Sequence, residues 1–84
     1  MIETNTTDLN GTSAQQLLDQ QLDAIAALRS AISMLCAAAP DRRDYQTAEV
    51  FGHAQAAHLE RLEKLESVMN ELEFLAERIA DQMD

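Results

Sequence analysis

Apolar residues recur every three or four positions in the first half of the chain, which is the spacing of one face of an α-helix. At about 100° per residue they fall within an arc of about 140°, with polar residues opposite. The row consists of Leu17, Leu18, Leu22, Ile25, Leu28, Ile32, Leu35 and Cys36. Ser13 and Gln16 have the spacing of a capping box, and Pro40 disfavours helical backbone in the residue before it. The pattern therefore predicts a helix over about 13–39.

Two polar residues lie in or beside this apolar row, and a cysteine ends it. Gln21 lies near its middle, where such a residue often sets the register between helices. Arg29 lies at its edge, and we expect its guanidinium to end in water or on a partner's carboxylate. Cys36 is near the C-terminal end of the helix, where the helix dipole does not favour a thiolate, so we expect a packed thiol.

A second apolar row follows residues 40–44, which we predict to form a turn. Asp41 or Asp44 is expected to cap the next helix, with Thr47 as a later alternative. The row advances in steps of four and three, which is a heptad pattern and predicts a helix over about 44–83. After Phe51, its members are His58, Leu62, Leu65, Met69, Leu72, Ala76, Ile79 and Met83.

The second apolar row is wider than a two-stranded coiled coil requires. Val68 and Leu75 add a flanking row beside it. A wide apolar stripe is typical of a helix that contacts two neighbours, as in a four-helix bundle.

Gly52 stands inside the second predicted helix, where glycine costs about 1 kcal/mol relative to alanine. One interpretation is a kink or break of the helix at this point. The other is a close helix crossing, because the neighbouring Ala54, Ala56 and Ala57 are also small. The sequence leaves both open.

Residues 1–12 are polar and have no apolar period, so they predict a flexible N-terminal arm. The remaining residues, 13–84, predict a single helical hairpin domain. With one Pro and two Gly in 84 residues, the chain lacks the turns that an all-β fold needs between strands.

The two predicted helices differ in length, roughly 39 Å against roughly 60 Å at 1.5 Å per residue. Folded back, the first would cover the second only as far as about Leu72, leaving the apolar row beyond it in water. We therefore expect an all-α antiparallel hairpin that assembles with a second copy into a dimeric four-helix-type bundle. The predicted self-association seam is Leu62, Leu65, Met69, Leu72, Leu75, Ala76, Ile79 and Met83.

Net charge argues against several classes of partner. Fifteen acids against six bases give −9, which repels nucleic-acid backbones and anionic membranes. The longest uncharged run, Ser30–Pro40, is far shorter than the roughly 20 residues of a membrane span. The acidic, polar start does not resemble a signal peptide, and the single Cys36 suits a reducing compartment. We expect a cytoplasmic protein that binds neither nucleic acid nor membrane.

Motifs that carry catalysis are missing from the sequence. There is no glycine-rich phosphate loop, no paired-cysteine motif and no HExxH. His53 and His58 lie about 140° apart on a helix, so they cannot share a metal ion unless the helix breaks. We expect His58 to be a hydrogen-bonded core or interface residue and His53 a surface residue. The prediction is a non-enzymatic protein without catalytic residues, metal or cofactor.

The C-terminal part of the second helix is strongly acidic, with six acids and one base from Leu65 to Asp84, a local charge of −5. Phe74 is predicted opposite the seam, among Glu71, Glu73 and Glu77. These four residues form the candidate partner surface, an apolar anchor ringed by carboxylates for a protein with a basic surface. The alternatives are a solvated acidic face and a Phe74 buried in a broad bundle.

The function that these features favour is an antagonist-type regulator or adaptor that binds another protein and itself. One alternative is a small secretion-type chaperone or co-chaperone that masks a client helix. Another is an acidic nucleic-acid mimic that blocks a nucleic-acid-binding protein. In general shape the hairpin is similar to small bacterial helical antagonists and secretion co-chaperones, and no residue motif assigns it to one family.

Overall fold

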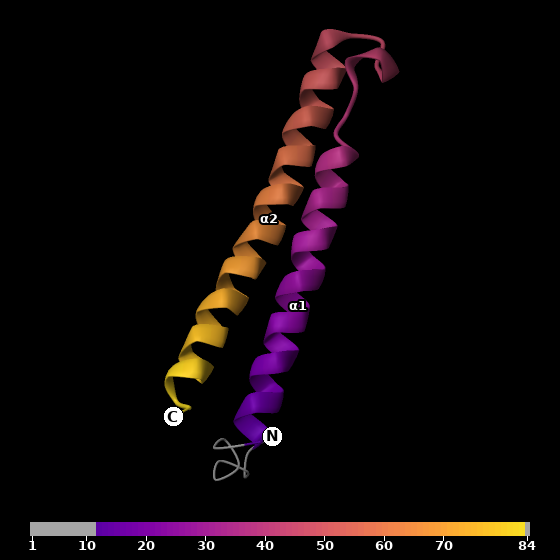
Figure 1. The fold of residues 1–84 in the computed structure, drawn as a ribbon. Helices are drawn as coiled ribbons and strands as arrows, with labels where there is room; N and C mark the ends of the chain where they lie inside the picture. Colours follow the sequence, from indigo (N-terminus) through magenta and orange to yellow (C-terminus); the bar gives the residue numbers. More distant parts are fainter. Residues whose placement is uncertain (1–11, 84) are drawn as a thin grey trace.

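The structure, a computed structural model, describes residues 12–83. Helix α1 (Thr12–Ala37) and helix α2 (Ala48–Asp81) run antiparallel, side by side, as Figure 1 shows. A short 3-10 helix, η2 (Arg42–Asp44), lies in the connection between them. Residues 12–83 contain no strand, and the rod measures 60 × 19 × 18 Å. The predicted all-α helical hairpin is confirmed at this level.

The ends of α1 differ slightly from the prediction. The helix begins at Thr12, so Ser13 is a helical residue and not the N-cap. It ends at Ala37, and the Ala38 N–H donates to the carbonyls of Met34 and Leu35 at 3.2 and 3.0 Å. Pro40 drives the residue before it out of the helical region, which explains the early end. The predicted flexible arm lies, except for Thr12, outside the described residues.

Two side chains of the connection, Asp41 and Thr47, cap the helices that follow them. Asp41 caps η2, accepting a 3.0 Å hydrogen bond from the Arg43 backbone N–H. That bond, together with one from the Arg43 side chain, lowers the pKa of the Asp41 carboxyl. Thr47 caps α2, its hydroxyl oxygen accepting from the Val50 N–H at 3.1 Å. Of the three candidate caps for α2, Asp41 and Asp44 were wrong and the later alternative, Thr47, was right.

The register of the hairpin overturns the length argument. Because residues 38–47 form the connection, α2 begins at Ala48 rather than near Asp44, and α1 lies alongside its C-terminal part. The N-terminal end of α1 and the C-terminal end of α2 meet at one end of the rod (Figure 1). Ala76 and Ile79, which were expected to remain uncovered, are buried. The prediction that α1 covers α2 only to about Leu72 is wrong.

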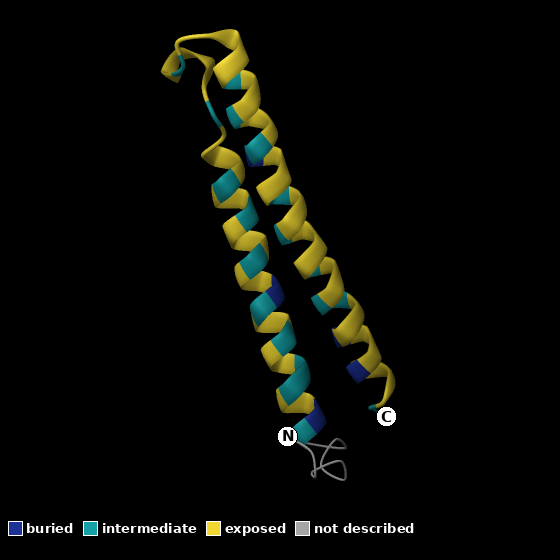
Figure 2. Ribbon diagram, turned by 180° about the vertical axis from the view of Figure 1, so that it is seen from behind, coloured by how far each residue is buried: buried dark blue, intermediate teal, exposed yellow. Residues whose placement is uncertain are grey.

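Few side chains are removed from water. The buried apolar residues of the described chain are Ala14, Ile25, Ala76 and Ile79, and none is wholly enclosed. Figure 2 shows half-buried residues along the facing sides of the helices and exposed residues over most of the surface. A chain of this size seldom reaches a stable fold with so small a core. The hairpin therefore leaves much of its apolar surface in contact with water.

Helix α2 runs unbroken through Gly52. A Cβ atom built on Gly52 would meet no atom within 4 Å, apart from its chain neighbours and the helix's own nearby backbone. Neither predicted role holds, because the helix does not break there and no other helix approaches closely.

We predict that Gly52→Ala raises the free energy of unfolding by about 0.5–1 kcal/mol, because alanine loses less backbone entropy in a helix and has room here. Urea unfolding followed by circular dichroism measures the change. The matched control is Ala56→Gly, an exposed α2 position, which should lower stability by a similar amount. A lower stability of Gly52→Ala would show that the glycine accommodates a contact.

Candidate binding surfaces

One long side of the hairpin carries a groove between the helices, of about 450 Å³. We call it the acidic groove; it is lined by Leu22, Ile25, Arg29, Glu73, Ala76 and Glu77. Ala76 occupies a heptad position that Met69 and Met83 fill one heptad before and after it. The hollow arises because this small side chain faces α1 between two large ones.

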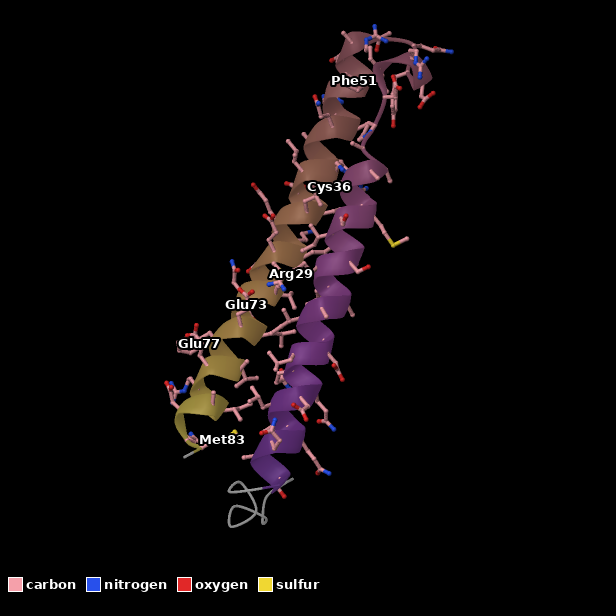
Figure 3. All side chains as sticks on the ribbon, in the orientation of Figure 1. Arg29, Cys36, Phe51, Glu73, Glu77 and Met83 are labelled. Carbon is pink, nitrogen blue, oxygen red and sulfur yellow. The ribbon has the colours of Figure 1, made fainter. Side chains whose placement is uncertain are left out.

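An ion pair crosses the acidic groove. Arg29 of α1 donates to the Glu73 carboxylate of α2 at 3.1 Å, and Figure 3 shows the two side chains meeting between the helices. Both side chains keep much of their exposure, so the pair contributes at most about 1 kcal/mol to stability. The ion pair helps to define how the two helices are aligned along their length, because it joins one position of α1 to one position of α2. The carboxylate that Arg29 meets belongs to its own chain.

The opposite side of the hairpin is apolar. A cavity of about 420 Å³ near the connection includes Leu35 and Arg61 in its lining, which places both on this side. Residues seven apart share a helix face in a heptad pattern, so Val68 and Leu75 follow Arg61 on α2, and Leu28 precedes Leu35 on α1. We call Leu28, Leu35, Val68 and Leu75 the apolar face.

Much of this apolar face remains in contact with water. Val68 and Leu75 are 44% and 43% exposed, while Leu28 and Leu35 are half-buried. The charged residues along this flank of α2 are the bases Arg61 and Lys64 and the acid Glu71, which follows Lys64 by seven residues. The two sides of the hairpin therefore differ in character: one is grooved with carboxylates at its rim, and the other is apolar with two bases and one acid beside it.

The predicted self-association seam mostly serves the intrachain interface. Ala76 and Ile79 are buried, and Leu75 alone is exposed. The half-buried members are Leu62, Leu65, Met69, Leu72 and Met83. Since helix-to-helix contact with α1 makes up most of the tertiary structure, these residues pack chiefly within one chain. The part of the second apolar row that stays exposed is its flanking row, Val68 and Leu75, which the extra width of the stripe indicates in the sequence.

The structure does not hold the predicted partner surface together as one ring. Phe74 is 60% exposed, and the Arg78 guanidinium lies 5.7 Å from the centre of its ring. Glu71 is exposed, but Glu73 is turned to Arg29 and Glu77 lines the acidic groove. The sequence alone groups these carboxylates around Phe74, but the structure divides them between the outer side of α2 and the acidic groove.

Two further side chains bear on the chemistry. Cys36 is exposed, so the expected packed thiol is wrong. His58 is only 6% exposed, and its Nε2 atom is buried with no hydrogen-bond partner, against the expected hydrogen-bonded histidine. His53 is exposed, as expected. An unsatisfied buried polar atom generally costs stability, so we expect His58 to stabilise the fold less than an apolar side chain at this position would.

Across residues 12–83 no group of three or more His, Cys, Asp or Glu side chains is placed to hold a metal ion. A search of the same residues finds no helix with the length and apolarity to cross a membrane. No protein-family model matches the chain, and no curated protein and no solved structure is significantly similar to it. Proposals about function therefore rest on these surfaces.

We predict that His58→Leu leaves the stability unchanged or raises it, because an apolar side chain of similar size removes the unsatisfied Nε2. Chemical denaturation at neutral pH measures this. Ile79→Ala, in the same buried row, is the control and should cost about 2 kcal/mol or more. A loss of over about 1 kcal/mol in His58→Leu would mean that Nε2 is hydrogen-bonded in solution.

Proposed function

We propose that this chain is a non-enzymatic, antagonist-type regulator or adaptor that binds another protein as a homodimeric helical bundle. The observation that supports the assembly most directly is the apolar face. Val68 and Leu75 stand in water beside half-buried Leu28 and Leu35 on a hairpin whose core is thin. Burying such a face stabilises a protein by about 25 cal/mol per Å² of apolar surface.

A second copy is the occupant that fits the apolar face best. Two hairpins joined through this face would form a four-helix core with closed two-fold symmetry, and no open face would remain for further copies. The chain has 15 acidic residues, yet the flank of α2 that holds this face carries two bases, Arg61 and Lys64, and one acid, Glu71. Bases therefore outnumber acids beside the proposed contact, which reduces the repulsion that a net charge of −9 would otherwise cause on self-association.

The regulator role follows from what dimerisation would leave exposed. The acidic groove and the acidic outer side of α2 would both remain available on each chain, on the side away from the dimer contact. A protein that offers binding surfaces without catalytic groups acts by occupying a partner. A chaperone would instead use the apolar face itself for a client helix, and would lose its dimer on binding.

We predict that sedimentation equilibrium at micromolar concentration gives twice the chain mass of 9.3 kDa. The double variant Val68→Glu/Leu75→Glu should sediment as a single chain, because it places four carboxylates in the symmetric contact. Met34→Glu/Phe74→Glu is the matched control, since it adds the same charge at exposed apolar positions outside the apolar face, and it should remain dimeric.

A single-chain mass for the unaltered protein would overturn the proposed dimer. Equal dissociation by both double variants would show that added charge alone, and not this face, controls assembly. A dimer that comes apart when a client protein is bound would favour the chaperone.

A further inference from the structure

We infer that the acidic groove is a docking site for a basic amphipathic helix of another protein. This deepens the proposed function, because it names the partner chemistry and moves the partner surface from Phe74 into the groove. A helix that lays its apolar side into a groove between two helices is a common mode of recognition.

The floor of the groove suits an inserted apolar side chain. Ile25 and Ala76 are buried at the base, and Leu22 forms a wall that is still 49% exposed. The hollow over Ala76 exists because the alanine side chain is small, whereas Met69 and Met83 at the neighbouring heptad positions are large. An apolar residue of an incoming helix would fill this space and cover Leu22, as an anchor residue does in a protein interface.

The rim of the groove determines the charge of the partner. Glu73 and Glu77 line the groove, and Glu66 lies seven residues before Glu73 on the same side of α2, where it extends the row of carboxylates beyond the lining. Glu73 is neutralised by Arg29. Among the described residues, Glu66 and Glu77 have no ion-pair partner. An incoming helix with Lys or Arg beside its apolar row would pair with these two carboxylates.

The same charges disfavour a second copy of this chain in the groove. Two acidic grooves facing each other would bring carboxylates against carboxylates at an unpaired rim. The apolar face has two bases and one acid beside it, a smaller obstacle, so the two sides of the hairpin are suited to different partners.

The experiment is isothermal titration of the full chain with a synthetic amphipathic helix of about 18 residues, bearing Leu on one side and Lys on the other. We expect saturable binding with one peptide per chain. A peptide with Glu in place of Lys should not bind. Binding of both peptides, or of neither, overturns the proposal.

Matched variants separate the groove from net charge. Glu66→Gln/Glu77→Gln should weaken binding of the Lys peptide about tenfold, since each of the two lost ion pairs contributes at most about fivefold. Glu60→Gln/Glu71→Gln makes the same change in net charge on the outer side of α2 and should have little effect. Equal weakening by both pairs would show attraction to the acidic chain as a whole and would overturn the site.

Apolar variants test the anchor. Leu22→Gln should weaken binding about tenfold or more, whereas Met34→Gln, at a residue that lies on the far side of α1, should not. Ala76→Leu should abolish binding by filling the hollow, with Ala56→Leu as its exposed control. If Phe74→Ala abolishes binding and Leu22→Gln does not, the partner surface is the outer side of α2 and the inference is wrong.

The sedimentation measurement distinguishes this inference from the proposed dimer. Leu22→Gln should remain a dimer, and Val68→Glu/Leu75→Glu should still bind the peptide as a single chain. Dissociation of Leu22→Gln into single chains would place a second copy in the groove and overturn the inference. A single-chain mass for the unaltered protein that still binds the Lys peptide would overturn the dimer alone.

Discussion

Two helices in contact can each cover only one stripe of the other, and this limit shapes the whole molecule. The stripe on α2 is wider than α1 can cover, so Val68 and Leu75 stay exposed although Ala76 and Ile79 beside them are buried. The core is correspondingly thin. A hairpin of this kind gains stability mainly from whatever covers its remaining apolar surface, which ties folding to binding.

The connection determines where the uncovered surface lies. Residues 38–47 are taken up by η2 and its flanking turns, so α2 begins later than its heptad pattern indicates. As a result α1 reaches the C-terminal end of α2, and the Arg29–Glu73 pair joins the helices in that register. The surplus apolar surface is therefore a lengthwise flank of the hairpin. It is not an overhanging end, and this difference changes which residues a second copy would contact.

The two flanks differ in chemistry. One places Arg61 and Lys64, with the single acid Glu71, beside apolar side chains, and the other places Glu73 and Glu77 beside the hollow over Ala76. Because the two flanks are separate, the proposed self-association and the proposed binding of a basic partner are both compatible with a net charge of −9. Unlike partners on unlike faces need not compete, so an adaptor role is physically consistent.

The sequence by itself determined the helical class, the hairpin, the single break between the helices and the exposed position of His53. These follow from the apolar period and the position of the proline, which are local properties. It also contained the capping signal at Thr47 among its alternatives. Only the tertiary structure decided the register, the pairing of Glu73 with Arg29, the exposure of Cys36 and the unsatisfied Nε2 of His58. These features depend on how many residues the connection contains and on how far one helix shields the other from water. Helical periodicity determines neither quantity.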